Sequence, residues 1–321
     1  MKRLLLLLPL GALLLGALAA AAWLDNSANR GVTYIPPSTP LPYADGPQVG
    51  VNLLNLHAEP DPAVVARSLT MVRDMGARYV RMQLPWEDIE IAAKGDFVDR
   101  RNDLNGDGAL DAVDAWRKYD RIVDTAASLG LSLTLRLERP PQWARLRAIA
   151  TLEWQEGVAR DGNSTGPPDT LSDYGDFVGR VAARYRGKVR FYQIWNEPNL
   201  KNEWNWQEPR PEAFVELLRV GAGAVRAADP AAVVIFPSLS PVDGLDKRAP
   251  MTELEYLDRV YVAGGGAYFD VMSAQAYGLG QPPDEHRYVR LRSRDNWTWR
   301  RPLDTRADVS RIVLLREVME R

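Results

Sequence analysis

The sequence predicts an α/β protein in which strand–helix units follow one another around a parallel sheet. Short apolar runs rich in β-branched residues alternate with amphipathic stretches from residue 49 onward. The amphipathic stretches carry apolar residues at or near i, i+3, i+4 and i+7, the spacing of one helix face. The first strand–helix turn has no Gly-x-Gly-x-x-Gly, which weakens a dinucleotide-binding interpretation.

Six apolar runs are the predicted strands. Most are largely apolar on both faces, as expected for a parallel sheet that helices cover. The runs are 49–54, 79–84, 131–137, 189–195, 232–236 and 269–276.

A helix is predicted after each strand. Tyr174, Phe177, Val178 and Val181 mark one apolar stripe, and the other amphipathic stretches present a similar face to a sheet. The predicted helical segments are 62–75, 119–126, 174–185, 214–225, 252–263 and 306–319.

This strict alternation implies a parallel sheet that is either open and doubly wound or closed into a barrel. A barrel of eight units needs two more units than the six predicted here. We therefore expect a barrel that is incomplete at its C-terminal end, with a partial catalytic domain over residues 48–321.

The N-terminus predicts export. Lys2 and Arg3 precede an apolar run over residues 4–24 that ends in small residues, as in a secretory signal. A run of ~20 apolar residues can also span a bilayer, so an uncleaved anchor is the alternative. Residues 25–47 contain five prolines and are predicted to be a linker. The folded domain would then be secreted or anchored outside the cytoplasm.

Composition narrows the classes of partner. The net charge of −2 gives no reason to expect nucleic acid or an acidic membrane surface. There is no cysteine, which excludes disulfides and thiolate metal sites. With two histidines, a histidine-rich catalytic zinc site is not expected.

A glutamate follows the fourth predicted strand. Glu197 stands in Trp-Asn-Glu-Pro, where Pro198 ends the strand. In barrels of strand–helix units, the carboxyl ends of the strands carry the active site. Glycosidic cleavage needs one carboxylic acid to protonate the leaving oxygen and a second carboxylate to attack the sugar or activate water. The alternative is a surface-loop glutamate.

The segment 192–199, Tyr-Gln-Ile-Trp-Asn-Glu-Pro-Asn, resembles the strand-four signature of glycoside hydrolase clan A. The resemblance is greatest to the family 39 and family 5-like branches, and a weaker likeness runs from Gly50 to the end. It implies a (β/α)8 TIM barrel and a retaining mechanism on β-linked glycans or glycosides. It also implies that Glu197 is the acid/base and that Asn196 contacts the sugar 2-hydroxyl.

Residues at other strand ends are candidates for substrate binding. For the charged ones, a structural ion pair is the alternative, and for the tryptophans the alternative is packing. Gln275 stands where the clan commonly has histidine, which puts the sugar contacts there in doubt. The candidates are Arg81, Trp86, Glu138, Trp204, Gln275 and Tyr277.

The clan places its nucleophile, a glutamate, after the seventh strand. No carboxylate in this sequence has that context, so we expect the nucleophile to lie beyond Arg321 and the fragment to be inactive alone. The retaining route needs both carboxyl groups ~5–5.5 Å apart. A non-catalytic carbohydrate-binding barrel and an unrelated α/β enzyme are the competing hypotheses.

Residues 103–114 match a calcium-loop pattern, Asp-x-Asn-x-Asp-Gly-x-x-Asp-x-x-Asp. Oxygen ligands at positions 1, 3, 5, 7, 9 and 12, with glycine at position 6, surround Ca²⁺ in loops of this type. The run resembles a single dockerin repeat and predicts a structural ion with a helix that starts near Asp111. A solvated acidic turn is the alternative. The predicted side-chain ligands are Asp103, Asn105, Asp107, Asp111 and Asp114.

Overall fold

The computed structural model describes residues 2–28, 49–103, 106–147, 165–242, 249–277, 309 and 311–321. The chain divides into two units. The first comprises residues 1–41, 241–243 and 275–321, and the second comprises residues 42–240 and 244–274.

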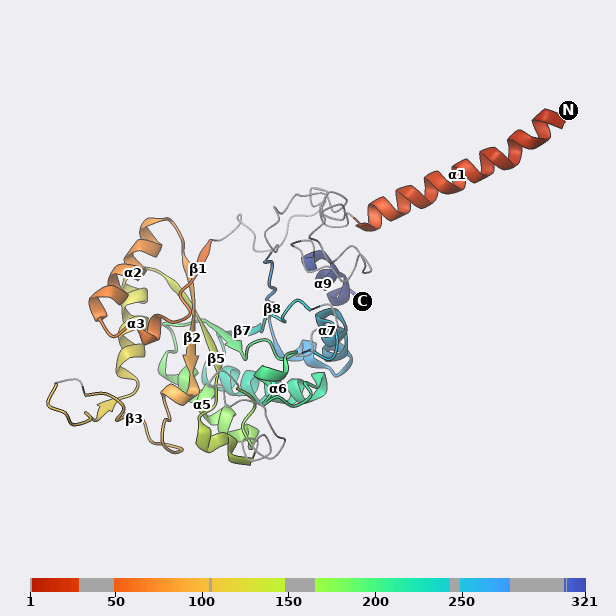
Figure 1. Cartoon of the computed structure of the whole chain (residues 1–321). Coiled ribbons are helices and arrows are strands. Elements are labelled where there is room, and N and C mark those ends of the chain that lie inside the picture. Colours follow the sequence, from red (N-terminus) through yellow and green to blue (C-terminus); the bar gives the residue numbers. More distant parts are fainter. Residues whose placement is uncertain are drawn as a thin grey trace. The chain divides into compact units, whose positions relative to one another are not determined.

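Among the described residues of the second unit, six strands form a curled parallel sheet (Figure 1). Each strand pairs with the next in chain order, so the order never reverses as it does in a doubly wound sheet. The architecture is that of an incomplete (β/α) barrel, which confirms the predicted fold class. The strands are β1 (Gly50–Asn52), β2 (Tyr79–Pro85), β5 (Ser132–Glu138), β6 (Phe191–Ile194), β7 (Val233–Phe236) and β8 (Val271–Met272).

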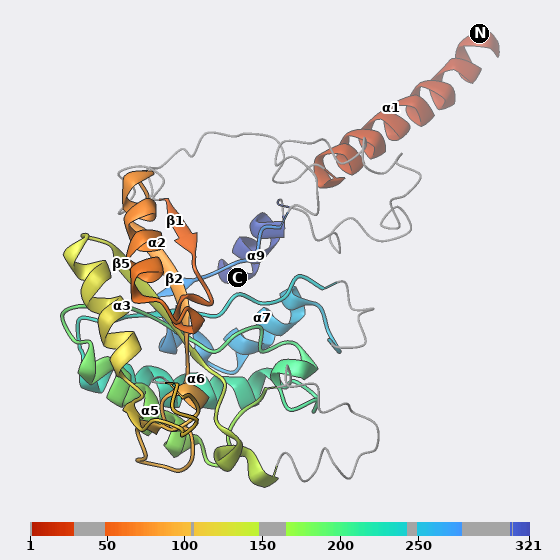
Figure 2. The same ribbon diagram turned by 60° about the vertical axis from the view of Figure 1, so that its left-hand side comes forward.

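The helices of this unit follow the strands and pack on one another in sequence (Figure 2). Helix α2 contacts α3, α5 contacts α6, and α6 contacts α7, which extends the alternation seen in the sequence. The α-helices are α2 (Pro62–Asp74), α3 (Arg117–Ser128), α5 (Leu171–Arg184), α6 (Pro211–Ala228) and α7 (Glu253–Val262). The 3-10 turns are η1 (Leu56–Ala58), η2 (Trp86–Asp88), η3 (Gln142–Arg145), η4 (Lys201–Glu203) and η5 (Gly265–Tyr268).

Local chemistry fixes where two of these helices begin. The Asp61 side chain accepts a hydrogen bond from the Ala63 amide at 2.8 Å, and Pro62 occupies the first helical position of α2. The Thr252 hydroxyl accepts from the Glu255 amide at 3.2 Å and caps α7. Both starts agree with the predicted helical segments.

The prediction that the strands are apolar on both faces is wrong for the central strands. In β2, Val80, Met82 and Leu84 are fully buried, whereas Arg81 and Gln83 alternate with them on the other face. Strand β5 repeats this alternation. The reason is that polar side chains on the second face are paired with one another there, as the site below shows.

The segment between β2 and α3 also differs from the prediction. Instead of a helix from Asp111, strand β3 (Val98–Asp99) pairs antiparallel with β4 (Val113–Asp114). The Asp114 carboxylate then accepts from the Trp116 amide at 3.0 Å, and α3 begins at Arg117. The predicted calcium loop, 103–114, therefore begins after β3 and ends with β4 of this hairpin.

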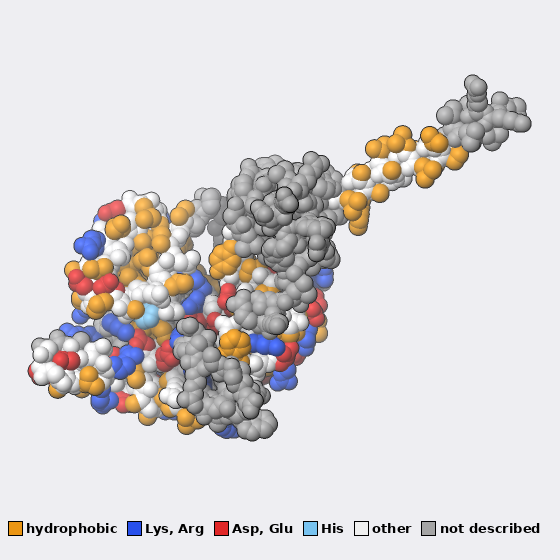
Figure 3. All heavy atoms as spheres, viewed as in Figure 1, with side chains coloured by type: hydrophobic (Ala, Val, Ile, Leu, Met, Phe, Trp, Pro, Cys, Tyr) orange, Lys and Arg blue, Asp and Glu red, His pale blue; other side chains and the backbone are white. Residues whose placement is uncertain are grey.

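The first unit contains α1 (Lys2–Ala28) and α9 (Arg311–Met319). Apolar side chains are exposed along α1, among them Leu10, Leu13 and Trp23 (Figure 3). In the part of the chain that the structure describes, no helix combines the length and apolar character needed to cross a membrane. Helix α9 matches the end of the predicted 306–319 helix; residues 306–308 and 310 lie outside the described residues.

Candidate active site

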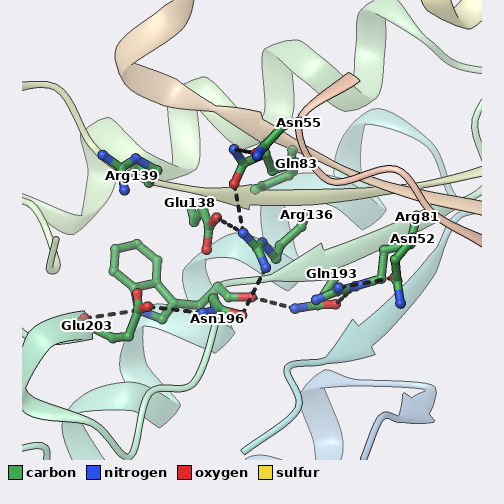
Figure 4. Close-up of polar contacts among 12 residues, drawn as sticks. Asn52, Asn55, Arg81, Gln83, Arg136, Glu138, Arg139, Gln193, Asn196 and Glu203 are labelled. Atoms are coloured by element: carbon green, nitrogen blue, oxygen red, sulfur yellow. Dashed lines mark hydrogen bonds and ion pairs between the residues drawn. The ribbon is translucent and has the colours of Figure 1, made fainter. Parts of the chain in front are cut away.

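Polar side chains from the carboxyl-terminal halves of β2, β5 and β6 form a connected network (Figure 4). Arg136 of β5 is its centre. Its Nη2 donates to Gln83 Oε1 at 2.7 Å and lies 2.5 Å from Glu138 Oε1, and its Nη1 donates to Asn196 Oδ1 at 3.1 Å. One guanidinium therefore connects two strands to the motif that contains Glu197.

Arg81 of β2 extends the network toward the edge of the sheet (Figure 4). Its Nε donates to Gln193 Oε1 at 2.8 Å, and its Nη1 lies 3.4 Å from Asn52 Oδ1. The Gln193 amide in turn donates to the Trp195 carbonyl at 2.8 Å. Arg81 thus supports the backbone immediately before Asn196 through Gln193.

The backbone at the ends of β5 and β6 is strained. Arg139, Trp195 and Glu197 have φ angles of 56°, 73° and 35°, in the left-handed region that favours glycine. Such residues cost on the order of 1–3 kcal/mol each and cluster at functional sites. Asn196 stands between two of them, so the chain holds this short segment in a conformation that its residues do not prefer.

Three further carboxyl groups belong to the surroundings of the motif. Glu138 is buried, and burial raises its pKa despite the ion pair with Arg136. Glu203 is partly buried; that burial and the nearby Glu138 charge raise its pKa to about 8. Glu87 pairs with Arg139 at 2.6 Å. Perturbed carboxyl groups of this kind are typical of catalytic sites and also occur in structural ion-pair networks.

No family model and no curated protein matches this chain. Solved structures of glycoside hydrolases are similar to it. A family 39 β-xylosidase from Caulobacter crescentus is 20% identical over 76% of this chain and 48% of that chain, with a TM-score of 0.46. A family 39 glycoside hydrolase from Bacteroides cellulosilyticus is 19% identical over 70% of this chain and 37% of that chain, with a TM-score of 0.44.

A family 5, subfamily 18 enzyme from Streptomyces cattleya is 16% identical over 73% of this chain and 52% of that chain, with a TM-score of 0.48. The chain spans between 37% and 52% of the lengths of these three structures. The observed strand order defines the fold, and the side chains described above define the candidate site.

The two predicted tryptophan contacts need correction. Trp86 has no exposed surface; its ring stacks on Phe177 at 5.3 Å, and its indole N–H donates to Glu90 at 2.6 Å. A sugar cannot reach it. Trp204 is 6% exposed and packs edge-on against Trp195, although its remaining surface borders a cavity of about 400 Å³. Packing is therefore the main role of both rings.

The other predicted residues divide between the two units. Arg81, Glu138, Asn196 and Glu197 lie within the second unit, Arg81 inside β2 and the other three at the carboxyl ends of β5 and β6. Gln275 and Tyr277 belong to the first unit, so the site described here does not include them.

The predicted calcium loop is described in part. Asp103 accepts from the amides of Gly106 and Gly108 at 2.7 and 2.8 Å, and Asp107 accepts from the Ala109 amide at 2.8 Å. Asn105 lies outside the described residues. Among the residues that are described, no group of three or more His, Cys, Asp or Glu side chains is placed to hold a metal ion. Calcium binding stays a prediction.

Five members of the network described above were not predicted: Asn52, Gln83, Arg136, Gln193 and Glu203. A signal was present for Arg136 and Gln83, because polar residues recur at every second position of β2 and β5. Glu203 had no such signal, since it lies in η4 and reaches the motif only through the fold.

A cavity of about 930 Å³ lies at the opposite end of the sheet. Arg186, Lys188 and Arg190, which precede β6, border it together with Arg226. Because the catalytic ends of such sheets are the carboxyl ends of the strands, we do not assign the active site to this cavity.

Proposed function

We propose that this chain contributes the acid/base half of a retaining glycoside hydrolase that acts on β-linked glycans or glycosides. Glu197 is the proposed acid/base. The observation that carries the proposal is the position of Glu197: it directly follows Asn196 at the carboxyl end of β6, in a strained segment held by Arg136. A carboxylic acid fixed at a strand end suits proton transfer to a leaving oxygen.

Asn196 is the proposed contact to a sugar hydroxyl. Hydrogen bonds to the 2-hydroxyl that strengthen in the transition state supply several kcal/mol in this chemistry. We further propose that the nucleophile is a glutamate on a later strand of the same protein, because the retaining mechanism needs two carboxyl groups. The chain spans part of the similar structures, so the activity belongs to the whole protein.

Export is part of the same proposal. The positive charges of Lys2 and Arg3 at the start of α1, followed by the apolar residues of the same helix, support a secretory signal or an N-terminal anchor. N-terminal sequencing of exported protein distinguishes the two. A mature protein that still begins at Met1 would contradict cleavage.

The decisive experiment compares the full-length protein with Glu197→Gln. The substitution should lower hydrolysis of glycosides with poor leaving groups by roughly 10²–10⁴-fold, the usual contribution of general acid catalysis. Aryl glycosides with activated leaving groups should still form the covalent intermediate, because their departure needs no acid.

Glu216→Gln is the matched control, since Glu216 is exposed on α6 and pairs with Arg219 of the same helix at 2.8 Å. Equal activity of Glu197→Gln and the unmodified protein would remove Glu197 from the mechanism. Sugar binding without hydrolysis by the full-length protein would instead indicate a non-catalytic carbohydrate-binding barrel.

A further inference from the structure

Asn196 is held from two sides. Arg136 Nη1 donates to its Oδ1 at 3.1 Å, and its Nδ2 donates to Glu203 Oε1 at 3.0 Å (Figure 4). A guanidinium carries donors and no acceptor, so Arg136 can face only the oxygen of the amide. The amide nitrogen must therefore point toward Glu203, and the orientation of the side chain is unambiguous.

Glu203 also holds the residue before Asn196. Its backbone carbonyl accepts from the Trp195 indole N–H at 3.2 Å, while its carboxyl group accepts from Asn196. Glu203 is itself fixed at the end of η4, where its amide donates to the Leu200 carbonyl at 3.1 Å. One residue thus contacts two consecutive residues of the motif through different atoms.

The contacts of Arg136 and Glu203 are made at the strained part of the backbone. Trp195 and Glu197, on either side of Asn196, both have positive φ. A strained conformation persists only when the surrounding structure over-determines it. The two contacts from Glu203 and the contact from Arg136 supply that restraint at the residues where it is needed.

The charge around Glu203 suits this role. Glu138, Arg136 and Arg139 face it from β5 and the residue that follows, and Glu197 faces it from the motif. Burial and the charges of Glu138 and Glu197 raise its pKa to about 8, which favours the neutral form of the group. A neutral acid accepts a hydrogen bond from Asn196 without adding a negative charge beside Glu197.

We propose that Glu203 is a positioning residue that fixes the amide of Asn196, so that the second N–H of this amide is offered to a sugar hydroxyl. An amide nitrogen carries two donor hydrogens, and Glu203 occupies one of them. The proposal rests on the proposed glycosidase function, because it concerns how a substrate contact of that site is oriented.

The first test is a double-mutant cycle in the full-length protein. Glu203→Leu removes the acceptor and should lower kcat/KM for an aryl β-glycoside by about 10- to 100-fold, a range typical of misplaced contacts. Glu203→Gln keeps an acceptor oxygen and should restore most of that activity. Because Glu203 acts through Asn196, Asn196→Ala with Glu203→Leu should be no worse than Asn196→Ala alone.

Independent, additive losses in kcat/KM would overturn the proposal, as would full activity of Glu203→Leu. A general structural role predicts additive losses, so the cycle separates the two. Glu216→Gln serves again as the control for loss of a glutamate on the surface.

The second test does not depend on activity. In side-chain amide NMR, the Asn196 resonances should titrate with a midpoint near pH 8 in the unmodified protein, as Glu203 ionises. The titration should vanish in Glu203→Gln. Asn196 resonances that Glu203→Gln leaves unchanged at every pH would overturn the proposal even if the protein cleaves glycosides. If the full-length protein hydrolyses no glycoside, the proposed function is wrong. The NMR experiment then still decides whether Glu203 holds the Asn196 amide.

Discussion

At the scale of single residues, His57 couples stability to pH. Its ring stacks on Tyr119 at 6.0 Å, and its buried Nδ1 has no hydrogen-bond partner among the described residues. Burial lowers its pKa from 6.5 to about 4, and the charge of Asp88 offsets only part of this effect. The unfolded chain therefore binds a proton on this group between pH 6.5 and pH 4, whereas the folded chain does not.

It follows that the contribution of His57 to stability is present above pH 6.5 and is lost as pH falls toward 4. The loss should be at most about 3 kcal/mol, since each pKa unit corresponds to ~1.4 kcal/mol. Urea unfolding at pH 7 and pH 4 should show a smaller decrease for His57→Phe, which keeps the ring contact and cannot titrate. Equal decreases would contradict the prediction.

Residue identities alone suggested part of the candidate site. Glu197 and Asn196 were proposed because a short string carries their chemistry, and their catalytic roles stay predictions. Trp86 was misassigned because its sequence position, directly after a strand, is also that of a core residue, and only the contact with Phe177 decides between them. Glu203 was missed because its contact with Asn196 depends on a turn that no local pattern specifies.

At the scale of elements, the six parallel strands and the helices between them were predictable, because the strands lie in apolar runs and the helices carry an apolar stripe. The hairpin of β3 and β4 was not, since its two-residue strands lie outside these runs. The polar face of β2 and β5 was not predicted, because the high apolar content of each run as a whole hides the polar residues at its alternate positions.

Substitutions at two glycines of α6 can test how closely this helix packs on the sheet. A Cβ at Gly221 would lie 3.1 Å from Ile194 Cγ2 and 3.2 Å from Tyr174 Cε1, whereas a Cβ at Gly223 meets nothing within 4 Å. Gly221→Val should destabilise the protein by about 1–3 kcal/mol through overpacking. Gly223→Ala should stabilise it by about 0.5–1 kcal/mol through helix propensity. Urea unfolding measures both, and equal effects would contradict the close packing of α6 on β6.

The loop between β3 and β4 tests calcium binding. The carboxylates of Asp103 and Asp107 organise its turns through amide hydrogen bonds, and oxygen ligands at these spacings suit Ca²⁺. Saturating Ca²⁺ at ~100 times Kd would stabilise the folded protein by about 2.7 kcal/mol. EGTA should then lower Tm by roughly 5 °C, given the usual scaling of Tm with stability.

Asp107→Asn should reduce that EGTA response, and Glu216→Gln, far along the sequence from the loop, should keep it. If EGTA leaves Tm unchanged and no calcium co-purifies with the protein, residues 103–114 are an acidic turn that binds no ion.

At the scale of the second unit as a whole, stability should come from the apolar layer between sheet and helices rather than from surface charges. Phe214 of α6 is fully buried, and its ring lies 5.5–6.4 Å from the rings of Trp204, Phe236 and Tyr256, which belong to the residue after η4, to β7 and to α7. Arg259 of α7 pairs with Glu212 of α6 at 2.7 Å, but both side chains are more than 40% exposed.

Phe214 and Arg259 both connect α6 with α7, so substitutions at these two residues can be compared directly. Phe214→Ala should cost about 3–5 kcal/mol, because it removes a buried ring and leaves a cavity between three elements. Arg259→Ala should cost less than about 1 kcal/mol, since solvent screens an exposed ion pair and 1 M NaCl weakens it further. Urea unfolding in low and high salt measures both. A loss for Arg259→Ala comparable to that for Phe214→Ala would mean that interhelical charges, rather than the buried aromatic contacts, hold α6 and α7 in place around the sheet.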